Sequence, residues 1–342
     1  MNELHGGNIY RNNECTDFSA NINPMGMPEH VRFQVIRNAE LWEHYPDPEC
    51  LMLRFSLAKR EGVTPAQVVC GNGADDLVWR IVQTLHPKNA LLAVPTFTEY
   101  ARALGAVGCD VKYYALSPEN VFLLDDTFLT WLHPETDMVI LCNPNNPTGR
   151  LISPLLLAEI CRKCEENATY LLVDECFLDL VESGEAFSAK QFLSPHVIVL
   201  NAFTKTYAIP GLRLGFAIFH DEALAERIRE EGQFWSVSTP AQVAGMAAVD
   251  ENEYLKKSRK LIQEERAFLT RELKRLGLRV FPSDANFILF QARPGLRRRL
   301  IEEHILIRCC DNFEGLDGTY YRIAVQARLE NGQLIRALGR NL

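Results

Sequence analysis

The middle of the chain alternates short apolar runs with segments of helical periodicity. At 75–85, 154–167 and 221–232, apolar residues return every three or four positions, as on a helix packed by one face. The apolar runs are short enough for buried strands of a parallel sheet. They span residues 91–95, 110–116, 138–143, 170–175, 197–203 and 214–219. This alternation predicts an α/β fold with a doubly wound, mostly parallel sheet in a large domain from about residue 45 to 240.

The pattern changes after Pro240. Many charges combine with apolar residues at helical spacing, which predicts one long connecting helix from Gln242 to Leu276. Four further apolar runs follow, at residues 278–283, 286–292, 305–310 and 320–326. They alternate with helical segments, which suits a smaller α+β domain. We expect residues 1–44 and 241–342 to form this small domain, so that both termini lie in it, and residues 45–240 to form the large one.

Length and charge exclude several classes of protein. The 342 residues, 47% of them hydrophobic, exceed what one core usually spans, so two domains are expected. Thirty-six basic and forty-four acidic side chains give a net charge of -8, which argues against nucleic acid as a partner. No apolar stretch approaches the roughly 18 residues of a membrane span, and the first residues are too polar for a signal peptide. We therefore expect a cytoplasmic protein that does not bind membranes.

The ten cysteines are scattered and mostly lie in apolar contexts, as reduced buried thiols do. Only Cys161 and Cys164 have CxxC spacing. They fall inside a helical pattern without a second pair, which favours an ordinary helix face over a zinc site. The sequence predicts no metal.

Polar residues follow several of the predicted strands. Gly71 and Gly73 end one strand and open a helix, where exposed N–H groups at the positive helix end suit a phosphate. A dinucleotide fingerprint would need glycine where Asp76 stands, and a tight helix-capping turn is the more frequent explanation of this motif on its own. Asn146 lies between two prolines that fix the backbone, so it is either a donor held at a strand end or part of a plain turn.

Asp174 ends another strand, and a buried carboxylate there requires a cationic partner. Lys205 follows the strand-like run 197–203, and Arg213 comes eight positions later. Separately, each of these residues could simply lie at the surface or in a salt bridge. Together they supply what an electron-sink cofactor needs, namely an amine for an imine, a carboxylate for a ring nitrogen, and phosphate and ring-oxygen donors.

With these motifs, the chain resembles the fold-type I pyridoxal-phosphate (PLP) enzymes, in the aminotransferase class I/II family that includes the histidinol-phosphate aminotransferases. Within this family, the chain resembles more closely the members that decarboxylate L-threonine O-3-phosphate in cobalamin biosynthesis than the histidinol-phosphate aminotransferases. The segments that carry the resemblance are HGGNIYR, DFSANINPMGMP, EHYPDPE, PTFTEYARALGAVGC, TKTYAIPGLRLGF and ILIRCCDNFEGLDGTYYRIAVQ.

The resemblance implies a role for each cofactor-binding residue. Lys205 would bond to the cofactor aldehyde, Asp174 would pair with the ring nitrogen, Asn146 would donate to the ring hydroxyl and Phe97 would stack on the ring. Tyr45 would reach the cofactor phosphate of a neighbouring subunit, which implies a homodimer with shared active sites. The phosphate would otherwise be held by Gly73, Ala74, Thr204 and Arg213.

The resemblance also implies the substrate contacts. Arg322 would bind the substrate carboxylate and Arg308 the substrate phosphate. Each arginine ends or interrupts an apolar strand, where an unpaired guanidinium is costly and an anionic ligand is a natural partner. The residues expected to close over the substrate are His5, Gly7, Asn8, Asn23 and Asn146.

The chain departs from its relatives at two positions. Phe177 stands where many relatives have a tyrosine that hydrogen-bonds the ring oxygen, and Ala202 stands where they often have a hydroxyl for the phosphate. Both changes leave imine chemistry possible, but they leave Asn146 a larger share of the ring contact and could weaken cofactor retention.

The implied activity is decarboxylation of L-threonine O-3-phosphate to (R)-1-amino-2-propanol O-2-phosphate. Transamination of histidinol phosphate with 2-oxoglutarate is the alternative, because the same residues serve both reactions. A cofactor-binding regulatory module is a more remote alternative, disfavoured because the chain shows no basic helix-turn-helix.

Overall fold

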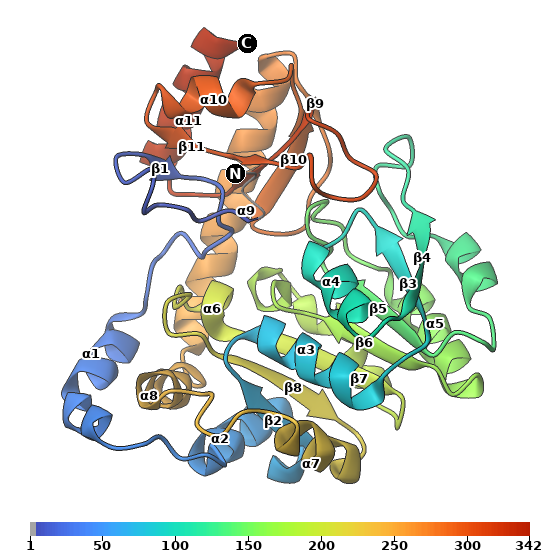
Figure 1. The fold of residues 1–342 in the computed structure, drawn as a ribbon. Coiled ribbons are helices and arrows are strands. Elements are labelled where there is room, and N and C mark those ends of the chain that lie inside the picture. Colours follow the sequence, from blue (N-terminus) through green and yellow to red (C-terminus); the bar gives the residue numbers. More distant parts are fainter. Residues whose placement is uncertain (1–4) are drawn as a thin grey trace.

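The computed structural model describes residues 5–342, and its largest feature is a seven-stranded sheet (Figure 1). The strands are β2 (Val68–Gly71), β3 (Asn89–Val94), β4 (Asp110–Ala115), β5 (Met138–Cys142), β6 (Tyr170–Asp174), β7 (Val197–Ala202) and β8 (Gly215–Phe219). They lie in the order β2-β8-β7-β6-β5-β3-β4. Strands β7, β6, β5, β3 and β4 are parallel, whereas β8 is antiparallel to both neighbours. The expected mostly parallel α/β fold is confirmed.

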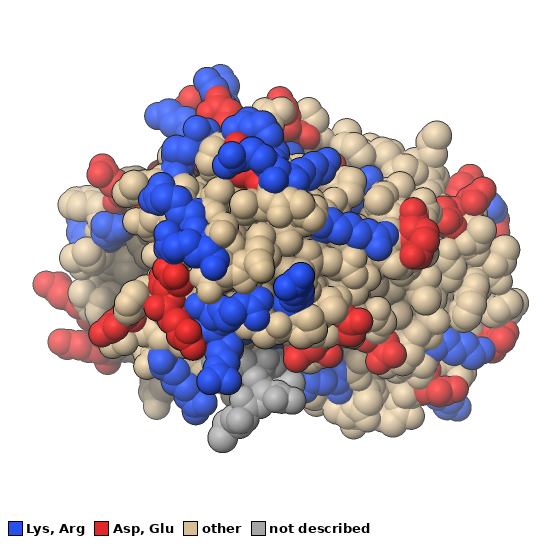
Figure 2. Space-filling view, turned by 90° about the horizontal axis from the view of Figure 1, so that it is seen from above, with Lys and Arg blue, Asp and Glu red and all other residues tan. Residues whose placement is uncertain are grey.

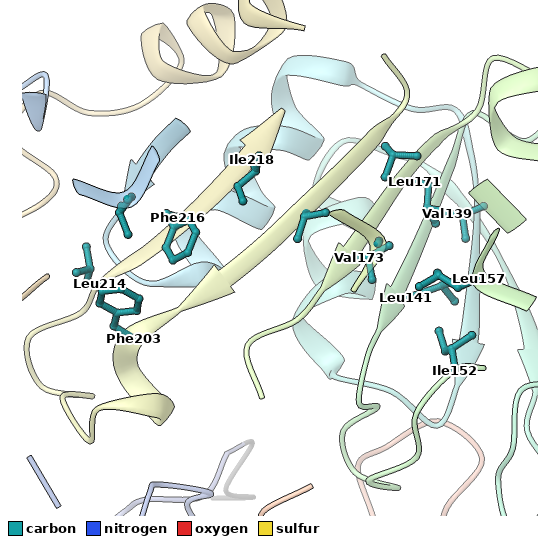
Figure 3. Packing of buried hydrophobic residues seen from close by; sticks show 14 of the residues in the cluster. Val139, Leu141, Ile152, Leu157, Leu171, Val173, Phe203, Leu214, Phe216 and Ile218 are labelled. Carbon is teal, nitrogen blue, oxygen red and sulfur yellow. The ribbon is translucent and has the colours of Figure 1, made fainter. Parts of the chain in front are cut away.

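Helices cover both faces of the sheet, because successive side chains of its buried strands point to opposite faces. On one face lie α2 (Leu51–Glu61), α5 (Pro154–Glu166) and α8 (Thr239–Ala248); on the other lie α3 (Ala74–Leu85), α4 (Thr98–Ala106) and α7 (Glu222–Glu230). On β6, Leu171 and Val173 join the first layer and Leu172 the second. Figure 3 shows the first layer, with Leu157 of α5 beside Leu141 of β5.

The C-terminal part contains a four-stranded antiparallel sheet in the order β12-β13-β10-β9. Its strands are β9 (Arg279–Val280), β10 (Phe287–Gln291), β12 (Arg308–Cys309) and β13 (Tyr320–Ala324), and its helices are α9 (Asn252–Arg275), α10 (Leu296–Ile301) and α11 (Arg328–Asn341). The buried side chains of β10 and β13 pack against α9 and α11 in a separate hydrophobic core. The C-terminal part therefore has a hydrophobic core of its own, separate from the two layers that pack on the large sheet.

The N-terminal segment contacts both parts of the molecule. Strand β1 (Thr16–Asp17) pairs in parallel with β11 (Ile305–Leu306), and Phe18 joins the C-terminal core. Helix α1 (Glu29–Arg37) packs instead against α8, with Val31 in the core beside the large sheet. The domain limits at residues 44 and 240 stay a prediction.

The single helix expected from Gln242 to Leu276 is wrong, because the structure divides this stretch into α8 and α9. Helix α8 begins earlier, at Thr239, where the Ser238 hydroxyl accepts a hydrogen bond from the N–H of Ala241. It is rich in alanine and buried on most sides, whereas α9 is charged and buries one face. The helix is interrupted at residues 249–251, between a helix buried on most sides and a helix buried on one face.

The surface around the C-terminal part mixes both signs of charge. Figure 2, which views the molecule from above, shows Lys and Arg side chains gathered among Asp and Glu side chains. Arg340 of α11, for example, lies 2.6 Å from the Glu303 carboxylate, and Arg299 of α10 donates to the Asn341 carbonyl. Among residues 5–342, no helix has the length and apolar character needed to cross a membrane.

Candidate active site

A cavity of about 320 Å³ opens where the large sheet faces the C-terminal part. It lies at the carboxyl ends of the parallel strands β5, β6 and β7, which is where open α/β sheets bind ligands. Strands β12 and β13 contribute Arg308 and Arg322 from the opposite side. The sequence-predicted residues that line it are His5, Ala74, Phe97, Asn146, Asp174, Thr204, Lys205, Arg213, Arg308 and Arg322.

Lys205 extends into the cavity from α6 (Phe203–Thr206), a single helical turn directly after β7. Its surroundings are short of negative charge. Burial, together with the positive Arg322 and Arg213 nearby, lowers the pKa of Lys205 to about 8. A substantial fraction of this amine is therefore neutral near physiological pH, the form that attacks an aldehyde.

Asp174 ends β6 and is buried, with neutral donors only. Its Oδ2 accepts a hydrogen bond of 2.5 Å from the Tyr100 hydroxyl, and its Oδ1 accepts one of 2.9 Å from the N–H of Cys176. Among residues 5–342, no Lys, Arg or His side chain forms an ion pair with it. Since a buried carboxylate requires a cation, the geometry suits a ligand with a protonated ring nitrogen.

Glu175 points to the opposite face of the sheet from Asp174 and is not part of the cavity. It accepts hydrogen bonds from the Ser188 hydroxyl (2.7 Å) and the N–H of Ala189 (2.6 Å), at the start of the 3₁₀ turn Ala189–Phe192. Burial raises the pKa of Glu175 to about 8, although both hydrogen bonds oppose the rise.

Glu175→Gln is expected to remove a loss of stability that develops between acidic and weakly alkaline pH. Because the folded-state pKa lies above the unfolded value, the folded protein holds one extra proton between about pH 4.5 and 8. The stability from this proton therefore falls progressively across that range and is gone above pH 8. The variant should match the wild type near pH 5 and exceed it by roughly 2 to 4 kcal/mol near pH 8.5. Urea unfolding at both pH values measures this difference. Glu264→Gln, at an exposed site on α9, is the matched control; parallel pH dependence in all three proteins would contradict the assignment.

The start of α3 forms a cradle with the size and charge of a phosphate site. Gly73 has a φ of 85° and precedes the first turn of α3. A Cβ at Gly73 would lie 2.3 Å from Arg213 Nη2, and one at Gly215 would lie 2.5 Å from the N atom of Ala74. Arg213 forms no ion pair with a carboxylate among residues 5–342. A close backbone, a helix N-terminus and an uncompensated guanidinium together favour an anion here.

One part of the cavity lining combines aromatic and amide groups. Phe97 packs edge-on against Tyr100, with 5.5 Å between ring centroids. Asn146 is buried, and its Oδ1 accepts a hydrogen bond from Arg322 Nη1, which leaves its amide nitrogen as the group able to donate. Phe177 lines the cavity without a hydroxyl and packs edge-on against Phe287. Ala202 lines it as well.

Arg308 and Arg322 lie directly opposite each other on β12 and β13, and both are buried. Arg322 donates to the Ser19 carbonyl at 2.8 Å, but its buried Nε has no hydrogen-bond partner among residues 5–342. Within the same residues, Arg322 forms no ion pair with a carboxylate. Arg308 donates to Asn312 and lies over the Phe313 ring.

This pairing places two like charges at directly opposed positions, which is unfavourable without a counterion. Burial first, and repulsion from Arg308 in addition, lower the pKa of Arg322 to about 10. Burial also lowers the pKa of Arg308. Two adjacent buried guanidinium groups are an arrangement that suits a ligand with two anionic groups.

The N-terminal residues meet the cavity only in part. His5 lines it, with Nε2 2.6 Å from the Glu99 carboxylate and its ring 5.8 Å from that of Phe97. Gly7 donates its N–H to the Ser19 hydroxyl and does not line the cavity. Asn8 does not line it either, and its carbonyl accepts from Asn12.

Asn23 does not line the cavity, and its expected substrate contact stays a prediction. Its amide nitrogen donates to the Thr206 carbonyl and the Ser258 hydroxyl, and its oxygen accepts from the N–H of Met25. Asn21, two residues earlier, lines the cavity, and its buried Oδ1 has no hydrogen-bond partner among residues 5–342.

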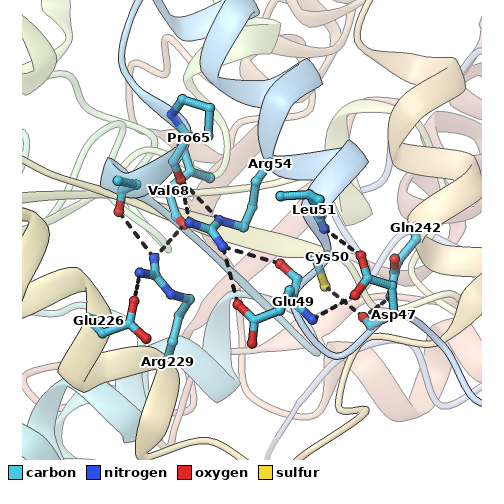
Figure 4. A network of polar contacts seen from close by, with 11 residues as sticks. Asp47, Glu49, Cys50, Leu51, Arg54, Pro65, Val68, Glu226, Arg229 and Gln242 are labelled. Atoms are coloured by element: carbon cyan, nitrogen blue, oxygen red, sulfur yellow. Dashed lines mark hydrogen bonds and ion pairs between the residues drawn. The ribbon is translucent and has the colours of Figure 1, made fainter.

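Tyr45 lies away from the cavity of its own chain. It is 79% exposed and stacks on Trp235 at 4.4 Å between ring centroids. The turn that follows it is fixed: Asp47 accepts from the N–H of Leu51 at the start of α2, and Gln242 donates to the Asp47 carbonyl (Figure 4). The structure thus presents Tyr45 at the surface on a well-anchored segment.

The cavity residues missed from the sequence include Asn21, Tyr100, Glu99 and Asp75. Tyr100 follows Phe97 by three positions, a spacing that places both on one side of a helix start and could have indicated it. Asp75 lies in the first turn of α3, and burial followed by repulsion from Glu99 raises its pKa.

The residues present fit pyridoxal phosphate. Among residues 5–342 the Asp174 carboxylate and the Arg213 guanidinium have no oppositely charged partner, Gly73 leaves space beside Arg213, and Lys205 supplies an amine in the same cavity. The fold and this set of side chains define a fold-type I PLP enzyme.

The chain belongs to the aminotransferase class I and II family, whose family model matches residues 13–340. It is 36% identical to the threonine-phosphate decarboxylase of Salmonella typhimurium, with 99% of this chain and 96% of the relative aligned. The solved histidinol-phosphate aminotransferase of Clostridium acetobutylicum superposes with a TM-score of 0.88 at 27% identity, covering 95% of this chain and 99% of that one. The L-threonine-O-3-phosphate decarboxylase of Porphyromonas gingivalis gives a TM-score of 0.83 at 27% identity, covering 94% and 98%. The expected PLP-dependent enzyme is confirmed.

Proposed function

We propose that this protein decarboxylates L-threonine O-3-phosphate to (R)-1-amino-2-propanol O-2-phosphate, a step of cobalamin biosynthesis. The observation that carries the proposal is the buried pair Arg308 and Arg322, which lie directly opposite each other and line the same cavity as Lys205. A substrate with a carboxylate and a phosphate would neutralise both guanidinium groups. The full-length similarity to a threonine-phosphate decarboxylase supports the same substrate.

Each residue would contribute a distinct part of the chemistry. When bound, PLP supplies an electron sink for the bonds of the substrate α-carbon. Asp174 would hold the ring nitrogen protonated, and Asn146 would donate to the ring hydroxyl. Lys205 would hold the cofactor and, with its pKa of about 8, exchange protons at Nζ near neutral pH.

The positions of the two anionic groups would decide which bond breaks. Arg322 would fix the carboxylate, and Arg308 the phosphate. Phe177 and Phe287 form an apolar wall beside Arg322, whose Cζ lies 5.6 Å from the Phe287 ring. An apolar wall would exclude water from the bond between the α-carbon and the carboxylate, which breaks when carbon dioxide leaves.

The test is to incubate the purified protein, reconstituted with PLP, with L-threonine O-3-phosphate. Carbon dioxide and the amino-alcohol phosphate are the expected products, in equal amounts. Formation of a 2-oxo acid without carbon dioxide would overturn the proposal, as would absence of any reaction by a fully reconstituted protein.

A histidinol-phosphate aminotransferase is the second candidate, favoured by the TM-score of 0.88 to such an enzyme. Arg308 would then bind the phosphate of histidinol phosphate, and Arg322 the carboxylate of glutamate. This activity predicts that glutamate converts the bound cofactor to its amine form, with loss of the yellow absorbance. An unchanged spectrum would exclude it.

The proposed enzyme is a homodimer in which Tyr45 of one subunit reaches the phosphate site of the other. An exposed apolar surface supports this assembly; it is formed by α1, the 3₁₀ turn Ala39–Glu43, α2 and the loop before α8. Its large exposed side chains are Phe33, Ile36, Leu41, Trp42, Tyr45, Leu51, Met52, Phe55, Phe234 and Trp235. Monomers rarely expose an apolar patch of this extent. The cytoplasm stays the predicted compartment.

Trp42→Glu is expected to convert the dimer to monomer at micromolar concentration, because it places a charge in this apolar surface. Sedimentation velocity measures the mass, and PLP retention should fall with it because Tyr45 would no longer reach the partner. Leu155→Glu, at an exposed position on α5, is the control and should leave both unchanged. A wild type that sediments as a monomer would contradict the assembly.

A further inference from the structure

Tyr100 is fully buried, yet its hydroxyl is directed at a residue that the cofactor needs. It lies in the first turn of α4 and donates a 2.5 Å hydrogen bond to Asp174 Oδ2. Its ring packs on Phe97 and belongs to the hydrophobic core on that face of the sheet. The ring alone would satisfy the packing, so the hydroxyl group has a separate explanation.

The surroundings of Asp174 make this hydrogen bond important. The carboxylate has no cation among residues 5–342, and its side chain otherwise accepts only the N–H of Cys176. Burial and the neighbouring Asp174 charge raise the pKa of Tyr100 well above its usual value, so the phenol keeps its proton and stays a donor. Burial likewise raises the pKa of the Cys142 and Cys176 thiols nearby. Tyr100 and the two thiols therefore keep their protons beside the Asp174 carboxylate.

We propose that Tyr100 is a positioning residue that holds Asp174 as a charged acceptor aimed at the ring nitrogen of the cofactor. The inference rests on the proposed cofactor site and adds a residue to it. Without the phenol, one carboxylate oxygen loses its only fixed donor. The carboxylate is then free to rotate or to take up a proton, and in either case it pairs less well with a protonated ring. Hydrogen bonds to charged groups are strong enough to change affinity about tenfold.

The experiment compares two cofactors in the wild type and Tyr100→Phe. One cofactor is PLP, and the other is its 1-deaza analogue, in which carbon replaces the ring nitrogen. Because Tyr100 would act through Asp174 on that nitrogen, the variant should bind PLP about tenfold more weakly and bind the analogue within twofold of the wild type. Equal losses for both cofactors, or no loss for either, would overturn the proposal.

A control separates this effect from the general removal of a buried phenol. Tyr254→Phe removes a hydroxyl that donates to the Gly26 carbonyl at 2.6 Å, outside the cavity. It should bind both cofactors as the wild type does. Thermal unfolding of the two apo variants shows whether either is globally destabilised.

A spectroscopic readout tests the same step without activity. In the wild type loaded with ¹⁵N-labelled PLP, the ring nitrogen should stay protonated at neutral pH. In Tyr100→Phe it should lose its proton at a pH lower by about one unit, whereas a merely structural role would leave this titration unchanged. A wild type that fails to bind PLP would refute the proposed function itself. Normal PLP binding with unchanged titration and discrimination would refute only the role of Tyr100.

Discussion

Lys205→Ala is expected to abolish the reaction, with a loss of at least about 1,000-fold, and to eliminate the covalent attachment of the cofactor. Its amine is the only one that lines the cavity in the part of the chain that the structure describes. Borohydride reduction of the wild type should fix a pyridoxyl group on the peptide that contains Lys205, and mass spectrometry of the variant should find none. A surviving adduct elsewhere would contradict the assignment.

The lowered pKa of Lys205 adds a pH dependence to this result. Since the neutral amine attacks the aldehyde, cofactor attachment to the apo protein should accelerate as pH rises toward about 8 and then level off. Stopped-flow absorbance of the newly formed imine measures the rate. Lys205→Arg is the matched variant, because it keeps a positive charge and cannot form the imine. Lys190→Ala, at a lysine paired with Glu61 outside the cavity, should behave as the wild type.

Arg322→Gln is expected to lower kcat/KM by about 100-fold or more, because the substitution removes a buried charge-assisted contact to the substrate. The product offers a sharp comparison, since it keeps the phosphate and lacks the carboxylate. Arg322→Gln should therefore leave product inhibition nearly unchanged. Arg308→Gln should weaken substrate and product alike. Steady-state kinetics with product as competitive inhibitor distinguishes the two arginines.

If Arg322→Gln weakened product inhibition and Arg308→Gln did not, Arg322 would bind the phosphate and Arg308 the carboxylate, and the assignment would be contradicted. Arg340→Gln is the control, because Arg340 is exposed and pairs with Glu303 at the surface. It should leave both substrate and product constants unchanged. Arg322→Lys should give an intermediate loss, because lysine keeps the charge and lacks the planar fork that binds a carboxylate at two points.

The cofactor half of the cavity could be predicted from the sequence because of one property of parallel sheets. The carboxyl ends of neighbouring parallel strands meet at one edge, so residues that follow β5, β6 and β7 had to lie together. Asn146, Asp174 and Lys205 do so. Their chemical roles were inferred from residue type and resemblance, and they stay predictions.

The remaining cavity residues could not be predicted, because their place depends on side-chain orientation, which the order of residues along the chain does not specify. Asn21 and Asn23 both lie in the segment SANINP, and only their side-chain directions assign one to the cavity and the other to Thr206 and Ser258. The contact of Tyr100 with Asp174 likewise depends on the direction of its hydroxyl, which the residue type does not reveal. The break between α8 and α9 was hidden because apolar residues keep helical spacing across it.

The hydrogen bond from Arg322 to the Ser19 carbonyl joins positions 303 residues apart, and it has a consequence for synthesis on the ribosome. Asn146, Asp174 and Lys205, at the ends of β5, β6 and β7, are synthesised before β12 and β13. Arg308 and Arg322 follow later, and Arg322 then bonds to a segment made long before it. A nascent chain should therefore assemble the Lys205 side of the cavity before the two arginines are added to it.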